Sequence, residues 1–279
     1  MQNKRSILIT GCSSGIGYDA AFELQKRGYD VIASARQQKD VDLLSSKGLF
    51  AVQLDLDDSL SIQTALEKTL THSDGKLYGL FNNGAYGQAG AVEDLSREVI
   101  RKQFETNVFG WMELTNAVIP IMRSQGYGRI IQNSSVLGLI ALKFRGAYNA
   151  SKYAIEGFSD TLRLELQGSN IFISTIEPGP IESAFRSNSY RAFKNNIDSE
   201  HSVFRKQYEI AANRLTQKGA VVPFTLPAKA VTNRVIHALE SKQPKPHYYV
   251  TFPTYLFGTL KRILSTRLLD KILLKVSNN

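Results

Sequence analysis

Residues 10–17 read Thr10-Gly11-Cys12-Ser13-Ser14-Gly15-Ile16-Gly17, and this stretch decides the fold. It ends a short β-branched run, Ser6–Thr10, and a helical pattern begins directly after it. Glycines at this spacing let the backbone turn tightly and approach a ligand closely, while a helix N-terminus offers free N–H groups and partial positive charge. A glycine loop between a first strand and a helix therefore predicts a phosphate cradle in a β-α-β unit.

The alternation of short strands and helical segments continues along the chain. Six segments read as strands with helical periodicity between them, and His247–Thr251 is expected to be a final strand. The pattern predicts an α/β fold: a single Rossmann-like doubly wound parallel sheet with helices on both faces, in one domain over residues 1–279. The six expected strands are Ser6–Thr10, Asp30–Ala35, Phe50–Leu54, Leu77–Asn82, Arg129–Asn133 and Ile171–Glu177.

Two segments depart from this alternation. Residues 180–226 carry prolines and scattered aromatic side chains, which predicts a substrate-loop excursion holding one or two short helices. Residues 254–276 combine leucine and isoleucine with basic residues at helical spacing, which predicts a basic amphipathic helix. That helix either closes over an apolar pocket, rests on an anionic membrane surface, or docks on the fold with a solvated basic face.

Composition limits the classes of function. The 279 residues are 43% apolar with a net charge of +9, which excludes a disordered or fibrous protein. Residues 201–279 hold 13 basic against 3 acidic residues but no recognition motif, so no nucleic-acid partner is expected. Cys12 is the single cysteine and forms no intrachain disulfide. With no signal peptide or membrane-spanning segment recognised, we expect a cytoplasmic protein with at most peripheral membrane contact.

The glycine loop resembles the Thr-Gly-x-x-x-Gly-x-Gly fingerprint of the short-chain dehydrogenase/reductase family. In that family a carboxylate at the end of the second strand selects NAD, because it binds the ribose 2′-hydroxyl. This chain has Ala35 followed by Arg36 at that position, which favours NADP, since a guanidinium binds a 2′-phosphate well. The alternative is that Arg36 is a solvent-facing residue at a strand end.

The resemblance implies further cofactor-binding residues. Asp55 matches an aspartate that contacts adenine, with Leu56 beside it, while Asp57 and Asp58 are expected to cap the next helix. Asn82-Asn83-Gly84-Ala85 departs from the family's Asn-Asn-Ala-Gly, which leaves the loop path open. The cofactor-binding set is Thr10, Gly11, Ser13, Ser14, Gly15, Ile16, Gly17, Arg36, Asp55, Leu56, Asn82, Gly84, Tyr148, Lys152, Pro178, Gly179, Ile181 and Ser183.

A candidate catalytic set lies downstream. Tyr148 and Lys152 are four residues apart, hence on one helical face, directly after the fifth expected strand. A second such pair, Tyr190 and Lys194, lies in the excursion and has no strand before it. Ser135 stands thirteen residues before Tyr148, which is the family's spacing, and Asn107 matches its fourth catalytic member. We therefore choose Ser135 rather than Ser134.

The resemblance also implies a role for each residue. Tyr148 is the general acid in reduction, and Lys152 lowers the pKa of the phenol and binds the nicotinamide ribose. Ser135 donates to the carbonyl oxygen, and Asn107 holds a helix distortion and a water through which protons reach Lys152.

Substrate and assembly are less constrained by the sequence. The aromatic side chains of the excursion either line an apolar substrate site or pack the excursion onto the sheet, and no basic pair is recognised beside the catalytic residues. The chain most resembles the branch of hydroxysteroid and retinol dehydrogenases and bacterial NADP-dependent aldehyde reductases. That branch implies reduction of an apolar aldehyde or ketone, with steroid or retinol alcohol oxidation and an NADP-sensing binding protein as alternatives. A homo-oligomer, dimer or tetramer, is also implied, with Trp111 either at its interface or in the core.

Overall fold

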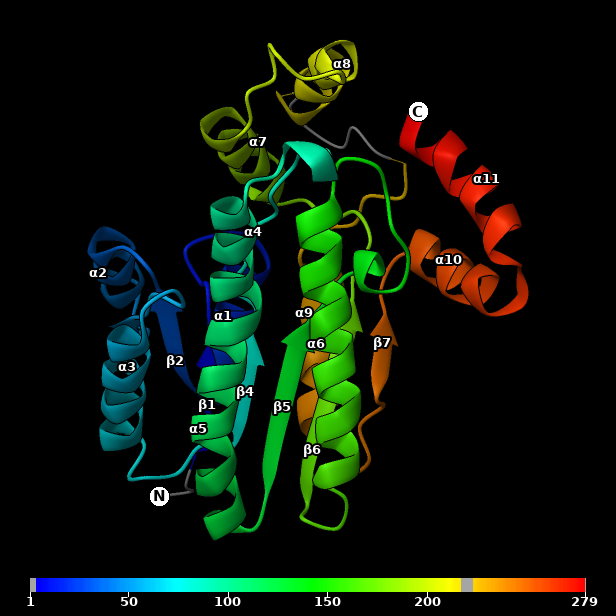
Figure 1. Cartoon of the computed structure of the whole chain (residues 1–279). Coiled ribbons are helices and arrows are strands. Elements are labelled where there is room, and N and C mark those ends of the chain that lie inside the picture. Colours follow the sequence, from blue (N-terminus) through cyan, green and yellow to red (C-terminus); the bar gives the residue numbers. More distant parts are fainter. Residues whose placement is uncertain (1–3, 217–222, 279) are drawn as a thin grey trace.

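The computed structural model describes residues 4–216 and 223–278 and contains a seven-stranded parallel sheet in the order β3-β2-β1-β4-β5-β6-β7 (Figure 1). The predicted fold class is confirmed, and each of the seven expected strands is present with bounds within two residues of the prediction. The strands are β1 Ser6–Ile9, β2 Asp30–Ala35, β3 Phe50–Gln53, β4 Gly79–Asn82, β5 Gly128–Asn133, β6 Ile171–Glu177 and β7 His247–Tyr249.

Helices cover both faces of the sheet because its central strands are buried on both sides. One face packs against α1 Gly15–Lys26, α2 Gln38–Ser46 and α9 Lys229–Glu240. The other packs against α3 Ser59–His72, α5 Gly110–Gln125 and α6 Gly146–Glu165. The strand order reverses between β1 and β4, and ligands of open α/β sheets bind at the carboxyl ends of the strands beside such a reversal.

The predicted excursion holds two helices above the strand ends, α7 Phe185–Asn196 and α8 Arg205–Thr216 (Figure 1). Tyr208 anchors α8: its ring is 2% exposed, and its hydroxyl accepts a hydrogen bond from the Ala91 amide at 2.7 Å. Phe193 and Phe204 pack with Tyr208. These aromatic side chains therefore fix the excursion to the body of the protein, which is the packing alternative.

The expected C-terminal helix is instead two helices, α10 Phe252–Ile263 and α11 Thr266–Asn278. The prediction of one continuous helix was wrong because Leu264 has an extended backbone, with ψ of 147°, which ends α10. The break folds α11 back, so that both helices lie beside β7 and above the loop after β5 (Figure 1). In the part of the chain described by the structure, no helix is both long and apolar enough to cross a membrane.

Candidate active site

The glycine loop is held by its neighbour on the sheet. The Thr10 hydroxyl accepts hydrogen bonds from the amides of Asn83 and Gly84, each at 2.8 Å, and so joins the ends of β1 and β4. Gly11 has φ of +72°, and a Cβ there would lie 2.6 Å from the Cα of Gly84. No side chain fits at Gly11, because the two loop backbones are in contact.

The N-terminus of α1 is open to a ligand. Ser14 is the N-cap residue, yet its side chain makes no capping hydrogen bond, so the first amides of α1 have no partner from it. A Cβ at Gly17 would lie 2.3 Å from the Gly11 carbonyl oxygen, which holds the helix start against the loop. Ser13 and Ser14 are exposed at this end. Exposed amides and hydroxyls at a helix N-terminus suit a phosphate group.

The end of β2 carries the residues expected to choose the cofactor. Ala35 is buried, whereas Arg36 is exposed, and Gln53 fixes the Arg36 carbonyl with a hydrogen bond of 3.0 Å. The Arg36 charge acts on the Tyr86 phenol, although burial still raises the pKa of Tyr86 to about 12. The Arg36 side chain therefore lies on the same side of the sheet edge as the loop after β4.

The three aspartates after β3 have different roles. Asp58 caps α3 by accepting the Leu60 amide, as predicted. Asp57 does not cap it, because its carboxylate accepts the Thr106 hydroxyl instead. Asp55 is half-buried, and one of its carboxylate oxygens accepts the Asp57 amide at 3.2 Å.

The Asn82-Asn83-Gly84-Ala85 loop keeps its asparagines on the sheet. Asn82 is fully buried and donates to the Thr115 hydroxyl at 3.0 Å, so its side chain does not reach the cofactor edge, contrary to the prediction. The neighbouring Asn83 is the asparagine that contacts the glycine loop: its side-chain amide donates to the carbonyls of Thr10 and Gly11 at 3.0 and 3.2 Å. Gly84 faces Gly11, and a Cβ there would meet the Leu56 side chain at 3.2 Å.

The segment after β6 closes the far side of the cradle. The Pro178 carbonyl accepts the Val136 amide at 2.8 Å, and Ile181 pairs with Leu226 in an isolated parallel bridge. A Cβ at Gly15 would lie 3.1 Å from the Cβ of Ser183, so this segment faces the glycine loop directly. The predicted residues of the two segments thus lie next to each other.

Tyr148, Ser135 and Lys152 meet at the exit of β5. Lys152 is 1% exposed, and its ammonium donates to the Asn133 carbonyl at 2.7 Å. The Ser135 hydroxyl accepts the Leu137 amide at 3.1 Å, which leaves its proton free for the Tyr148 phenol. Lys152 lies 5.7 Å from the centre of the Tyr148 ring. The rejected pair is elsewhere, because Tyr190 packs with the excursion.

Burial dominates the electrostatics of these groups. It raises the pKa of Tyr148 to about 12, against the opposing effects of the Ser135 hydroxyl and the Arg145 charge. It also lowers the pKa of Lys152 to about 7, which the charge of Glu156 opposes. The structure does not show Lys152 lowering the pKa of the phenol, because its ammonium donates to the Asn133 carbonyl. The groups that lower the pKa of Tyr148 are the Ser135 hydroxyl and the Arg145 charge.

Asn107 lies in a π-helical turn, Glu105–Phe109, between α4 Arg97–Phe104 and α5. The predicted helix distortion is therefore present, and such turns are frequent at functional sites. The Asn107 side chain donates to the Tyr86 carbonyl at 2.9 Å and to the Ser151 hydroxyl at 3.2 Å, and it accepts the Tyr86 amide. Asn107 thus holds the loop after β4 against α6.

Trp111 and Arg145 belong to this site but were not predicted in it. Trp111 is fully buried, its indole N–H donates to the Gly84 carbonyl at 2.8 Å, and Lys152 lies 4.3 Å from its ring centre. The core alternative for Trp111 is therefore correct. A cation against an indole face is stabilised, and the ring also excludes water from Lys152.

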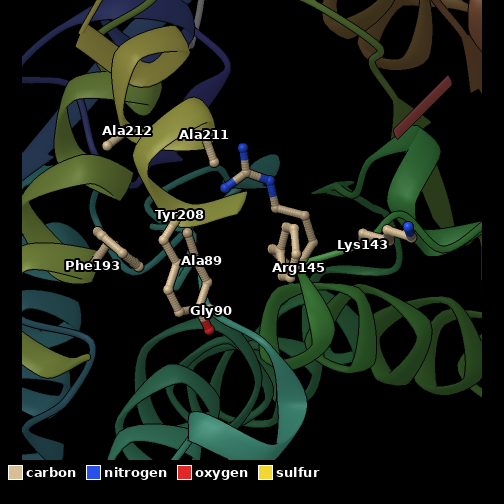
Figure 2. Close-up of a pocket in the computed structure, with 9 residues that line it drawn as sticks. Ala89, Gly90, Lys143, Arg145, Phe193, Tyr208, Ala211 and Ala212 are labelled. Carbon is tan, nitrogen blue, oxygen red and sulfur yellow. The ribbon is translucent and has the colours of Figure 1, made fainter. Parts of the chain in front are cut away.

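Arg145 is a single basic residue whose charge reaches the catalytic tyrosine. Together with Lys143 it lines a small hollow beside α8, and in Figure 2 its guanidinium points toward Ala211. Its charge still acts on Tyr148. The signal was available in the sequence, since Arg145 stands three residues before Tyr148.

The C-terminal helices form an apolar wall beside Tyr148. Phe257 of α10 and Leu269 and Leu273 of α11 belong to one buried cluster with Tyr148. The Phe185 ring lies 5.2 Å from the Tyr148 ring, centre to centre. One face of α10 and α11 therefore packs in the same cluster as the catalytic group. Both the lid and the docked helix with a solvated basic face are consistent with this packing, and both stay predictions.

Comparisons with known proteins identify the family of the chain. Residues 5–193 match the family model described as short chain dehydrogenase. The chain is 42% identical over 270 residues to the uncharacterized oxidoreductase YbbO of Escherichia coli, covering 97% of this chain and 94% of that protein. It is 37% identical over 191 residues to human retinol dehydrogenase 8, covering 65% of this chain and 60% of that protein.

Solved structures show the same fold at lower identity. A short chain dehydrogenase from Burkholderia cenocepacia in complex with NADP has a TM-score of 0.74 and 21% identity, covering 98% of this chain and 99% of that one. One from Burkholderia phymatum in complex with NAD has a TM-score of 0.76 and 23% identity, covering 94% and 92%. Both cofactors occur among proteins of this fold.

Proposed function

The chain belongs to the short chain dehydrogenase family, and from this premise we propose that it reduces apolar aldehydes or ketones with NADPH. The observation that carries the proposal is the surroundings of Tyr148, a buried phenol with an apolar wall on one side and Ser135 on the other. Membership of this family by itself implies an oxidoreductase that binds a nicotinamide dinucleotide.

The residues present fit such a cofactor. The uncapped start of α1 suits its phosphates, and Ser183 and Ile181 face the glycine loop from the opposite side. Lys152 is buried at the exit of β5 and has donors to spare beyond the Asn133 carbonyl. When bound, the cofactor supplies a hydride to the carbonyl carbon.

Tyr148 and Ser135 supply the proton and the polarisation. Ser135 donates to the carbonyl oxygen, and Tyr148 donates its proton as negative charge develops there. A phenol is protonated at neutral pH and is therefore ready to act as the acid in reduction. We favour carbonyl reduction over the alcohol oxidation that the name retinol dehydrogenase describes for the relative, because NADPH generally drives reduction.

NADPH rather than NADH is proposed from the end of β2. The side chain of Ala35 offers no carboxylate to a ribose 2′-hydroxyl, and the exposed Arg36 is free to move onto a 2′-phosphate. Arg36 acts on Tyr86, so it reaches toward the adenosine side of the cradle.

The outer face of the C-terminal helices supports a second proposal, a peripheral contact with anionic membranes. Large apolar side chains are exposed there, among them Phe252 at 56%, Ile263 at 69% and Leu268 at 47%. Basic residues accompany them: Lys261, Arg262, Arg267, Lys271 and Lys275. Exposed apolar groups beside cations suit an anionic lipid surface, from which an apolar substrate would reach the wall at Tyr148.

A homo-oligomer is proposed from the outer face of α6. Phe158 and Leu164 are 45% and 71% exposed there, and Phe109 is 52% exposed in the neighbouring π-helical turn. An apolar face on a helix of this length suits a two-fold contact with a second copy.

An NADPH-consumption screen tests the function. Aliphatic aldehydes, aromatic aldehydes, retinoids and ketosteroids are offered, with NADH in parallel and retinol with NADP for the reverse direction. We expect turnover that rises with the apolar length of the carbonyl compound. NADPH binding without turnover of any compound would indicate the NADP-sensing protein instead.

Flotation with anionic and neutral vesicles tests the membrane contact, and no preference for anionic vesicles would refute it.

A further inference from the structure

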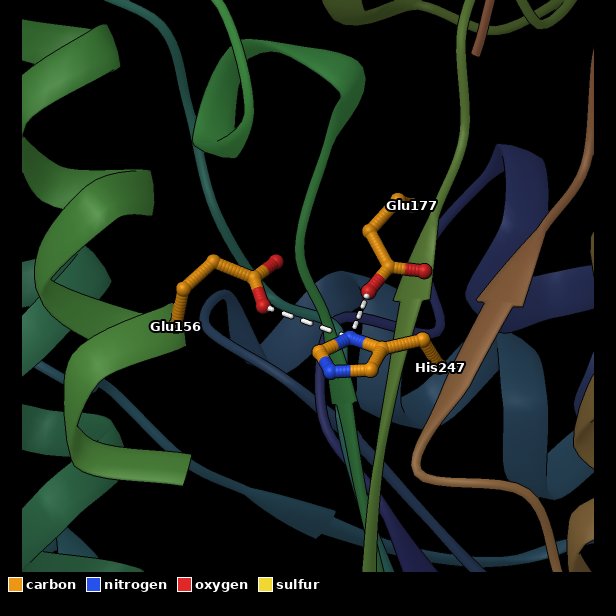
Figure 3. Close-up of side chains that lie close together, drawn as sticks. All are labelled: Glu156, Glu177 and His247. Carbon is orange, nitrogen blue, oxygen red and sulfur yellow. Dashed lines mark hydrogen bonds and ion pairs between the residues drawn. The ribbon is translucent and has the colours of Figure 1, made fainter. Parts of the chain in front are cut away.

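Three chemistry-bearing side chains that the catalytic site does not use gather between α6 and the edge of the sheet. Glu156 lies on α6 one turn after Lys152, Glu177 is the last residue of β6, and His247 is the first residue of β7. Figure 3 shows both carboxyl groups directed at the imidazole. One ligand atom from each residue lies within 4.8 Å of the others.

The distances are those of a site in which the ligands surround a small volume. His247 Nδ1 is 2.8 Å from Glu177 Oε1 and 3.8 Å from Glu156 Oε2. Nitrogen and oxygen ligands bind Zn²⁺ at about 2.0–2.2 Å, so two of them lie about 3.4 Å apart in tetrahedral geometry. Only small movements of the side chains separate the cluster from this arrangement.

Glu156 is the side chain that the protein alone leaves unexplained. The residue is 9% exposed, and both of its carboxylate oxygens are buried without a hydrogen-bond partner in the described part of the chain. The nearby Ser134 hydroxyl also lacks a normal hydrogen bond. A buried carboxylate in this state is costly unless a cation or a proton compensates it.

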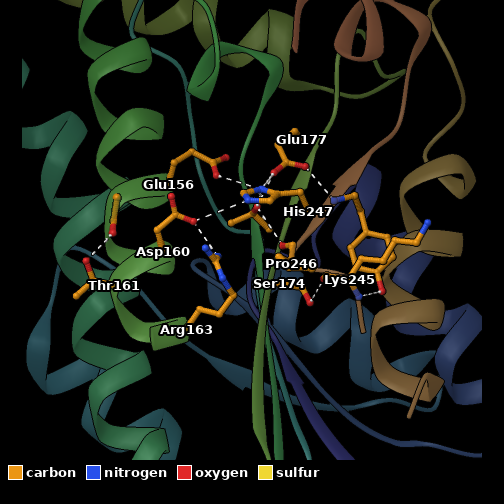
Figure 4. A network of polar contacts seen from close by, with 12 residues as sticks. Glu156, Asp160, Thr161, Arg163, Ser174, Glu177, Lys245, Pro246 and His247 are labelled. Atoms are coloured by element: carbon orange, nitrogen blue, oxygen red, sulfur yellow. Dashed lines mark hydrogen bonds and ion pairs between the residues drawn. The ribbon is translucent and has the colours of Figure 1, made fainter. Parts of the chain in front are cut away.

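The residues around the cluster are arranged as supports for ligands. Glu177 accepts the Tyr248 amide at 3.1 Å and the Thr175 hydroxyl, which fixes its carboxylate. Asp160 lies 3.8 Å from His247 Nε2, the ring nitrogen opposite the cluster, and is itself paired with Arg163 at 2.8 Å (Figure 4). At this distance Asp160 places negative charge beside the far nitrogen without a direct hydrogen bond to it.

We propose that Glu156, Glu177 and His247 bind a divalent transition metal, with Zn²⁺ as the best match. Two carboxylates and a neutral imidazole compensate the charge of a dication, and a water completes the coordination. The His247 side chain is 33% exposed, which gives an ion a path to the cluster. In the described residues no second group of three such ligands occurs, and the Cys12 thiol is fully buried.

The ion would join three elements that carry the active site. Glu177 directly precedes Pro178, where the segment facing the glycine loop begins, and α6 carries Tyr148 and Lys152. A bound dication would also hold Glu156 ionised beside Lys152, whose pKa the Glu156 charge affects. The role assigned to the ion is therefore structural, and its readout is binding and thermal stability rather than turnover.

The test is calorimetric titration of the chelator-treated, desalted full chain with ZnCl₂ at neutral pH. The wild type should bind one equivalent and melt at a higher temperature with Zn²⁺. His247→Ala and Glu156→Gln should each weaken binding at least about tenfold. His201→Ala is the matched control, because His201 forms an exposed pair with Asp198 at 2.7 Å, away from the cluster. This variant should bind Zn²⁺ with the affinity of the wild type.

Glu156→Gln keeps the volume of the side chain, so it separates loss of a ligand from loss of folding if His247→Ala is unstable. The proposal is overturned if the wild type binds no Zn²⁺, or if binding persists unchanged in Glu156→Gln. A higher melting temperature of Glu156→Gln without metal, together with a wild type that does not respond to Zn²⁺, would assign a shared proton to the cluster instead.

Discussion

Replacement of Gly17 by alanine tests whether the glycine loop is fixed by packing. A Cβ at Gly17 would lie 2.3 Å from the Gly11 carbonyl oxygen and 2.6 Å from the side-chain nitrogen of Asn83. Both distances are shorter than 3.0 Å, which Cβ contacts in proteins essentially never are. The Gly11 oxygen belongs to the backbone and cannot rotate away. The Asn83 side-chain amide is held by hydrogen bonds of 3.0 and 3.2 Å to the carbonyls of Thr10 and Gly11. The loop must therefore shift and weaken these bonds.

Overpacking costs about 1–3 kcal/mol and each of the two weakened hydrogen bonds about 0.5–1.5 kcal/mol, so Gly17→Ala should lower the free energy of unfolding by roughly 2–6 kcal/mol. For a chain of this size that corresponds to a melting temperature lower by roughly 3–10 °C. NADPH binding should weaken as well, because the α1 N-terminus moves. Trp111 is the single tryptophan and lies beside Lys152, so its fluorescence is the expected readout of NADPH binding.

Gly157→Ala is the matched control. Gly157 lies within α6, is exposed, and has nothing within 4 Å of the position of a Cβ. Alanine favours a helix interior over glycine by about 0.5–1 kcal/mol, so this variant should melt slightly higher than the wild type. The same substitution should thus have opposite signs at the two positions. Equal melting temperatures for Gly17→Ala and the wild type, with equal NADPH affinity, would refute the packing argument.

Three further predictions concern the catalytic and cofactor residues. Tyr148→Phe should bind NADPH normally with turnover below a tenth of wild type in the absorbance assay, and a larger remaining rate would mean a different acid. Arg36→Ala should raise KM for NADPH far more than KM for NADH, whereas an unchanged ratio would make Arg36 a surface residue. Because burial lowers the pKa of Lys152 from 10.5 to about 7, the unfolded chain holds a proton between those pH values that the folded chain has released. Urea unfolding should therefore show the wild type gaining stability relative to Lys152→Met as pH rises from 7 toward 10, and parallel pH profiles would contradict the buried charge.

The sequence predicts the strands and the catalytic residues because both depend on local patterns. The β-branched runs and glycine turns mark each strand, and Tyr148, Lys152 and Ser135 stand at fixed spacings on elements that the sheet brings together. The break between α10 and α11 lacks such a pattern, since Leu264 and Ser265 are neither glycine nor proline. The helix ends there because α11 packs its apolar side chains on the cluster around Tyr148, which is a tertiary effect.

The Asn82 and Asn83 roles show a second limit of sequence reasoning. Successive residues of a strand point to opposite faces, so a shift of one position exchanges a cofactor-facing side chain for a buried one. Asn82 still lies within β4 and turns to Thr115 in the core, while Asn83 has left the strand and reaches back to Thr10. The motif predicts two asparagines at the sheet edge, but only strand register decides which one serves the loop.

Lys152 connects the catalytic site to the rest of the molecule. Its ammonium is buried against Trp111 and Asn133, where the cost of burial lowers its pKa toward neutrality. The nearest anion acting on it is Glu156, which belongs to the cluster with Glu177 and His247. Whatever holds Glu156 ionised therefore favours the charged form of Lys152, and whatever protonates it favours the neutral amine. The cluster beyond α6 thus acts on Lys152, one helical turn after Tyr148, although no side chain of the cluster belongs to the catalytic set.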